Sequence, residues 1–134
     1  MQRLGIIGGS GLARIQALGV ERQEVVRTPF GDPSAPLTFG QLDGLPIVFL
    51  PRHGTGHRLP PHKVNYRANI WALHHVGVKQ IIGVAAVGGI TQPPGALCVP
   101  DQLIDYTWGR ESTFFDGDQD QVVHIDFTQP YSQD

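Results

Sequence analysis

The sequence is poor in residues that would each point to a particular class of protein. It holds one cysteine among 134 residues, which excludes an internal disulfide, and the apolar neighbours of Cys98 favour a buried, unreactive thiol. Charged residues make up 16% of the chain and the net charge is −2, so no broad nucleic-acid-binding surface is expected. No apolar run is long enough for a signal peptide or a transmembrane helix, so we expect a cytoplasmic protein with no membrane partner.

The chain does contain enough apolar residues, 40% of the total, for the core of one domain. The patterns predict a short helical turn over residues 13–19, a helix over 63–76, and strands over 5–8, 24–28, 37–42, 46–50, 80–87, 96–99, 102–104 and 122–125. Residues 80–87 are apolar on both faces, which is typical of a central strand with cover on each side. One helix cannot provide that cover. Either the sheet closes on itself like a barrel, or the chain is the front part of a larger α/β domain.

A glycine-rich turn follows the first predicted strand, with the hydroxyl of Ser10 at its centre. Glycine lets the backbone approach a ligand closely, and successive backbone N–H groups together with a hydroxyl can bind an anion the size of phosphate. The spacing does not match a dinucleotide-binding fingerprint, because Arg14 stands where glycine or alanine is needed, and no P-loop lysine follows. A tight turn without a ligand is the alternative.

Two further strand ends carry residues suited to an anion or a flat ring. Arg52 follows an apolar strand and precedes His53 and Gly54, so its guanidinium emerges where open α/β sheets bind ligands. The run Ala-Ala-Val-Gly-Gly over 85–89 ends another strand with small residues that leave backbone N–H groups accessible. A surface ion pair at Arg52 and a plain glycine turn at 88–89 are the alternatives left open.

Neither a metal site nor a serine nucleophile is indicated. The six histidines include His53 and His57, four residues apart, but no HExxH or paired Cys/His spacing is present. Ser10 lacks the G-x-S-x-G setting, because Leu12 stands where the last glycine belongs. We therefore expect no metal and no cofactor.

Five segments stand in a characteristic order: GIIGGSGL at 5–12, TPFG at 28–31, RHG at 52–54 with His57, VNYRANIWAL at 64–73 and DQLID at 101–105. Together they resemble the methylthioadenosine phosphorylase branch of the trimeric purine nucleoside phosphorylases. The resemblance implies an α/β fold with a mixed, partly barrel-like central sheet flanked by helices. It covers only the N-terminal part of a single phosphorylase domain, so residues 1–134 are expected to lack the C-terminal part.

The same resemblance implies a pentosyltransferase that cleaves a 5′-methylthio purine nucleoside, methylthioinosine or methylthioadenosine, with orthophosphate as co-substrate. The products are the free purine base and 5-methylthioribose 1-phosphate, as in purine salvage. By position, phosphate contacts fall on Ser10, Arg52, His53, Ala85 and Ala86, purine and ribose contacts on Ala86, Val87 and Gly88, and the 5′ pocket on His57 and His124. Alanine at 85 replaces a hydroxyl or amide common in relatives, which removes one hydrogen-bond donor.

The resemblance also implies a homotrimer, since His124 matches a position that reaches into a neighbouring subunit. The residues that select the base lie in the family's C-terminal half, so we expect the 134-residue chain alone to be inactive. Residues 87–90 resemble the members that use 6-oxopurines. The alternatives are a general purine nucleoside phosphorylase, a non-catalytic nucleoside- or phosphate-binding module, and a nucleoside hydrolase. Dependence on phosphate separates a phosphorylase from a hydrolase.

Overall fold

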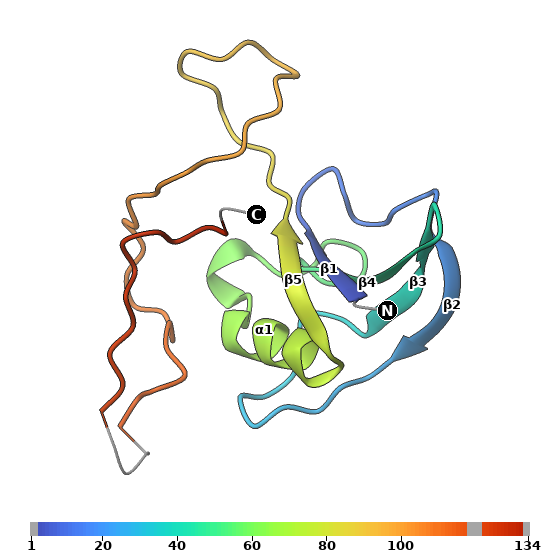
Figure 1. Ribbon diagram of the computed structural model, residues 1–134, viewed down its shortest axis with the longest axis horizontal. Helices are drawn as coiled ribbons and strands as arrows, with labels where there is room; N and C mark the ends of the chain where they lie inside the picture. The colour runs from blue at the N-terminus through green and yellow to red at the C-terminus, as the bar shows by residue number, and fades with distance from the viewer. Residues whose placement is uncertain (1–2, 118–121, 133–134) are drawn as a thin grey trace. The chain divides into compact units, whose positions relative to one another are not determined.

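The computed structural model describes residues 3–117 and 122–132, in two compact units, Met1–Ala86 and Val87–Asp134. The first unit contains one five-stranded sheet in the order β2-β3-β4-β1-β5 (Figure 1). Its elements are β1 (Arg3–Gly8), β2 (Gly19–Glu24), β3 (Leu37–Leu42), β4 (Leu45–Pro51), the 3-10 helix η1 (Pro61–Lys63), α1 (Tyr66–His75) and β5 (Val78–Gly83). Both parallel and antiparallel pairs occur, which confirms the expected mixed α/β class. The sheet is open, with β2 and β5 at its edges.

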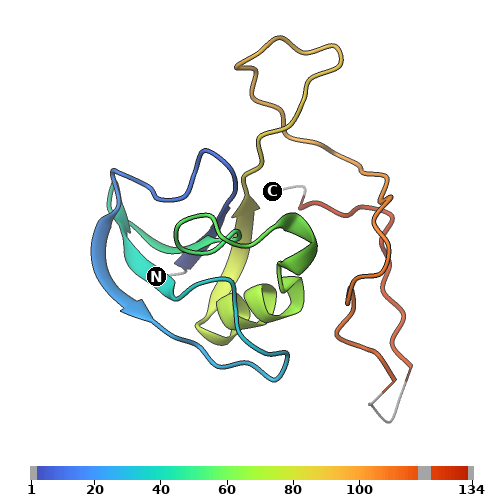
Figure 2. The ribbon, with the colours of Figure 1, turned by 180° about the vertical axis from the view of Figure 1, so that it is seen from behind.

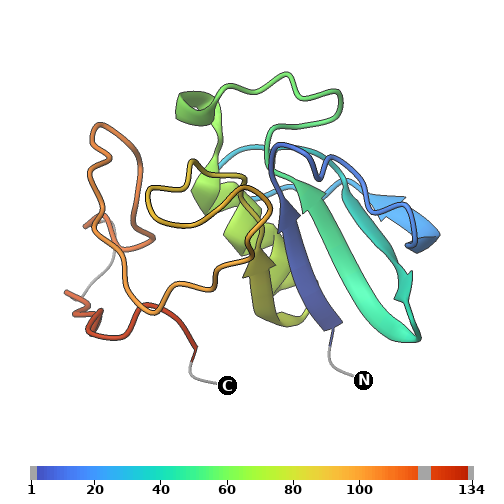
Figure 3. The same ribbon diagram turned by 90° about the horizontal axis from the view of Figure 1, so that it is seen from above.

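Three neighbouring strands of this sheet run in the same direction. β1 lies between β4 and β5 and is parallel to both, with Gly8 opposite Pro51 and Ile7 opposite Gly83. Parallel strands present their carboxyl ends at one edge of a sheet, where α/β proteins bind ligands. Figure 3 shows the arrows of β1 and β4 ending side by side at this edge.

The hairpin between β3 and β4 is formed as the sequence predicts. Asp43 and Gly44 adopt φ values of 49° and 80°, and Leu42 pairs with Leu45 across the turn. Positive φ at both central residues is the requirement of the two-residue turn that matches the twist of paired strands, and Asp-Gly satisfies it.

Alternate residues of β4 pack into two separate cores, one on each face of the sheet. Val48 and Leu50 join Ala72 and Leu73 of α1, so the helix covers this face. Ile47 and Phe49 point to the other face, in a cluster completed by Ile6 and Leu18.

Helix α1 begins three residues later than the predicted 63–76 helix because its cap is Asn65. The Asn65 side-chain oxygen accepts a hydrogen bond from the Ala68 N–H at 3.0 Å, which satisfies a donor of the first turn. Gly77 follows the helix with φ 87° and donates its N–H to the His74 carbonyl at 3.0 Å. The predicted glycine cap is therefore confirmed.

Two local predictions in the first unit are wrong. Residues 13–18 form bends and a turn, with the Leu18 N–H donating to the Ile15 carbonyl, and no helical segment, and residue 19 already belongs to β2. The strand expected over 24–28 lies at Gly19–Glu24, because pairing with β3 sets its position (Gly19 opposite Gln41). Val26, beyond that strand, packs into the core beneath α1.

The burial predicted for 80–87 is also wrong. Among the described residues β5 pairs with β1 alone and lies at the sheet edge, so Ile81 and Ile82 remain 39% and 49% exposed. In the described part of the second unit, residues 96–99, 102–104 and 122–125 form no strand. Cys98 is exposed and not buried as expected, since the segment around it packs into no core.

Candidate functional site

The main chain of Arg52 extends the pairing of β1 with β4 by one residue, and its side chain reaches the end of β5. The Arg52 N–H donates to the Gly8 carbonyl at 2.9 Å, and Nη1 donates to the Val84 carbonyl at 2.8 Å. The Val84 N–H in turn donates to the carbonyl of Ile7 at 2.9 Å. The guanidinium therefore lies at the shared carboxyl edge of the three parallel strands, as expected from the sequence.

Gly9 provides the space in which this guanidinium lies. A Cβ atom added at Gly9 would sit 2.6 Å from Cζ of Arg52 and 2.8 Å from the Val84 carbonyl oxygen, closer than real side chains approach. The chain then turns at Gly9-Ser10-Gly11-Leu12, where the Leu12 N–H donates to the Gly9 carbonyl at 3.0 Å and Gly11 has φ 83°. The glycine turn and Arg52 thus meet at one place, with Ser10 exposed on the turn.

His53 and His57 lie together in the turn that follows Arg52. His53 is 8% exposed and its Nδ1 is 2.8 Å from the Leu59 carbonyl, which can only accept, so Nδ1 carries the proton. The ring of His57 lies with its centroid 4.4 Å from that of His53. Gly54, between them, donates its N–H to the Pro51 carbonyl at 2.9 Å. These bonds fix the backbone of the turn at the strand edge.

The other predicted site residues fall into two groups. Ala85 and Ala86 follow directly after Val84, whose carbonyl accepts from Arg52, so they continue the chain from the carboxyl end of β5. Val87, Gly88 and His124 belong to the second unit, where all three are exposed. The first unit therefore brings Ser10, Arg52, His53, His57, Ala85 and Ala86 to one edge of the sheet.

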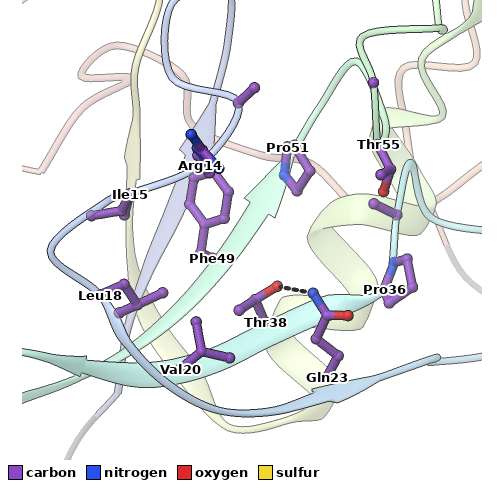
Figure 4. A pocket seen from close by; sticks show the side chains of 13 residues that line it. Arg14, Ile15, Leu18, Val20, Gln23, Pro36, Thr38, Phe49, Pro51 and Thr55 are labelled. Atoms are coloured by element: carbon purple, nitrogen blue, oxygen red, sulfur yellow. Dashed lines mark hydrogen bonds between the residues drawn. The ribbon is translucent and has the colours of Figure 1, made fainter.

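A cavity of 440 Å³ lies in the first unit, on the sheet face opposite α1 (Figure 4). Apolar side chains such as Ile15, Leu18 and Phe49 line it, and one wall carries the Thr38 hydroxyl, which accepts from Gln23 Nε2 at 3.1 Å. The predicted site residues do not line this cavity. It was not anticipated, because its walls come from segments far apart in the sequence.

Residues 3–117 and 122–132 contain no group of three or more His, Cys, Asp or Glu side chains able to hold a metal ion. Within the same residues, no helix has the length and apolar character required to cross a membrane.

Sequence reasoning identified the glycine turn but missed what Gly9 and Val84 do in it. Val84 contributes a backbone carbonyl, for which no residue type gives a signal. Position 9 must be glycine because the Arg52 guanidinium lies against it. This contact can be inferred only when the parallel pairing of β1 with β4 is known.

Known phosphorylases resemble nearly the whole of this chain in sequence. The chain is 50% identical over 130 residues to a probable S-methyl-5′-thioinosine phosphorylase of Pseudomonas syringae pv. tomato, matching 96% of this chain and 53% of that protein. It is 45% identical over 135 residues to the S-methyl-5′-thioadenosine phosphorylase of Pyrococcus horikoshii, matching 98% and 50%. The chain thus spans about half the length of these curated relatives.

A solved structure extends the likeness to three dimensions. The methylthioadenosine phosphorylase of Schistosoma mansoni in complex with adenine superposes with a TM-score of 0.89 at 40% identity, covering 98% of this chain and 49% of that one. The sequence profile of the Phosphorylase superfamily matches residues 3–134. The chain belongs to the Phosphorylase superfamily.

Proposed function

We propose that this sequence forms the phosphate-binding half of an enzyme that cleaves a 5′-methylthio purine nucleoside by phosphorolysis. The observation that carries the proposal is the meeting of the Gly9-Ser10-Gly11 turn with the Arg52 guanidinium at the edge where β1, β4 and β5 end. The names of the relatives support the nucleoside class.

In the proposed reaction, an oxygen of orthophosphate forms a bond to C1′ of the sugar as the N-glycosidic bond breaks. The bonding pair leaves with the purine, which takes up a proton, and 5-methylthioribose 1-phosphate remains. The reaction needs no protein nucleophile, because orthophosphate is the attacking group. Orienting that anion and stabilising the separating charge are the tasks left to the protein.

Each residue at the strand edge has a proposed role in holding the anion. Arg52 binds phosphate oxygens through its guanidinium. The Ser10 hydroxyl and the neighbouring backbone N–H groups of the turn donate hydrogen bonds to the same phosphate. His53 adds an imidazole contact, and Ala85 and Ala86 contribute backbone N–H groups alone. In the same proposal Ala86, Val87 and Gly88 line the purine and ribose, and His57 lies at the 5′ pocket with His124 of a neighbouring subunit in a homotrimer.

A second candidate is a nucleoside without the methylthio group. A probable 6-oxopurine nucleoside phosphorylase of Thermococcus kodakarensis is 46% identical over 138 residues, matching 98% of this chain. Comparing methylthioinosine, methylthioadenosine and inosine as substrates decides between these possibilities.

The activity test joins residues 1–134 to the part of the Pseudomonas syringae relative that lies beyond the matched segment. Release of base is expected only with orthophosphate present, and residues 1–134 alone are expected to release none. Arg52→Ala should raise the apparent KM for phosphate about ten- to hundredfold, because one charge-assisted hydrogen bond to phosphate is lost. Release without phosphate would show a hydrolase, and nucleoside binding without any release would favour a binding module.

A further inference from the structure

The loop formed by residues 28–36 lies beside α1 (Figure 2). Two asparagines one helical turn apart hold it there. Asn65 Nδ2 donates to the Phe30 carbonyl at 2.7 Å. Asn69 Nδ2 donates to the Ser34 hydroxyl at 2.9 Å, and Asn69 Oδ1 accepts from the Ser34 N–H at 2.7 Å. Each pair is 35 residues apart in the sequence, so the loop keeps the four-residue spacing of the helix face.

Asn69 is a polar residue in an apolar setting. It is 2% exposed, and its helix neighbours Ala68, Ala72 and Leu73 are fully buried. A buried amide without hydrogen-bond partners destabilises a fold. Both ends of the Asn69 side-chain amide make hydrogen bonds to a single loop residue, Ser34. The contact therefore specifies where Ser34 lies.

Ser34 in turn lies against the turn that carries Arg52 and His53. Its carbonyl oxygen would be 3.0 Å from a Cβ added at Gly54, which has φ 76°. Gly54 follows Arg52 and His53 directly, and residues of the loop and of this turn, including Ser34 and Gly54, line a common cavity of 470 Å³. A shift of Ser34 would remove the support behind Gly54.

The contact also joins two of the sequence segments that the phosphate site does not use. The TPFG segment at 28–31 opens the loop, and the VNYRANIWAL segment at 64–73 contains both asparagines. No ligand contact is proposed for either segment.

We infer that Asn69 is a positioning residue of the phosphate site. It fixes Ser34 against Gly54 and so holds the Arg52-His53 turn in the conformation that faces the glycine turn. Asn69 acts through Ser34 and Gly54. The inference rests on the proposed function only where it predicts a change in phosphate affinity.

The first test needs no ligand. Hydrogen exchange followed by mass spectrometry compares residues 52–59 with the β4 segment 45–51 in the parent chain and in Asn69→Ala. The variant should exchange about tenfold faster in 52–59, beyond any change in β4, because the support of the turn is lost. Leu73→Val is the matched control, since Leu73 is a buried core residue of the same helix and its truncation should affect both segments alike.

A second variant keeps the test decisive if Asn69→Ala does not fold. Ser34→Ala removes the hydroxyl but keeps its N–H bond to Asn69 Oδ1, so a smaller rise in the same segment is expected. Unchanged exchange of 52–59 relative to β4 in Ser34→Ala and in any folded Asn69→Ala protein overturns the inference.

The phosphate arm separates this inference from the proposed function. Titration calorimetry with orthophosphate should give a dissociation constant about tenfold higher for Asn69→Ala than for the parent. Asn69→Asp should recover part of the affinity, since its carboxylate can accept from both the N–H and the hydroxyl of Ser34. If the parent binds no phosphate, the proposed function fails while the exchange result still decides the role of Asn69. If folded Asn69→Ala binds as tightly as the parent, the inference fails alone.

Discussion

At the scale of single residues, the proposed phosphate site requires glycine at position 9. In Gly9→Ala the new Cβ would overlap the Arg52 guanidinium and crowd the Val84 carbonyl, so Arg52 must move. Phosphate affinity should fall at least about tenfold, as expected when a charge-assisted hydrogen bond is lost. Gly83→Ala is the matched control, because a Cβ at Gly83 meets no atom within 4 Å. Equal phosphate affinity in Gly9→Ala and the parent would contradict the assignment.

A second prediction at this scale concerns the carboxyl group of Asp105 in the second unit. The Thr107 hydroxyl and N–H donate to it at 2.7 Å and 2.9 Å and lower its pKa below the ordinary 3.8, with a smaller contribution from the charge of Arg110. The stabilisation is therefore present above the ordinary carboxyl pKa and is lost as the pH falls through the lowered value.

Thr107→Val should raise the pKa of Asp105, because it removes the hydroxyl that has the largest effect. Carboxyl carbon NMR during an acid titration measures the change. Asp126, whose pKa is lowered by the equivalent bonds from Thr128, serves as an internal control and should titrate unchanged. An Asp105 titration identical to that of the parent would rule out the Thr107 hydroxyl as the cause.

At the scale of elements, the β3–β4 hairpin gives the cleanest test of local sequence control. Gly44→Ala should lower the free energy of unfolding by about 1 kcal/mol, since φ 80° is strained for alanine although the added Cβ meets no atom. Asp43→Asn, at φ 49°, should change it little because asparagine tolerates this region. Urea denaturation measures both variants. A Gly44→Ala midpoint equal to that of the parent would mean that another feature sets the turn.

The elements that could be predicted from the sequence are those whose signals are local. The hairpin, the end of α1 at Gly77 and the glycine turn after β1 depend on residues next to one another, so their signals are local. The position of β2 depends on pairing with β3, and its own sequence is mostly polar. The candidate site was predicted where strand ends carry recognisable residues. The support through Asn69 and Ser34 was not, because it joins residues 35 apart.

At the scale of the whole molecule, the exposed edge strand β5 has a measurable consequence for the 134-residue chain. Ile82 is 49% exposed on a strand that, within residues 3–117 and 122–132, pairs on one side only, and unpaired apolar edges favour association between molecules. Sedimentation velocity should show self-association that rises with concentration and is reduced in Ile82→Lys. Val20→Lys, on the opposite edge strand β2, should have a smaller effect because residues 21–24 of that strand are already polar or charged. Equal behaviour of both variants would contradict this role of β5.

The central claim is that one phosphate ion is shared by the glycine turn and Arg52. An amide-resolved NMR titration of the chain with orthophosphate tests it most directly. We expect the amides of Ser10, Gly11, Arg52 and Ala85 to shift together with a single dissociation constant, and Arg52→Ala to raise that constant about ten- to hundredfold. Shifts of Ser10 and Arg52 with different dissociation constants, or no shift at either residue, would contradict it.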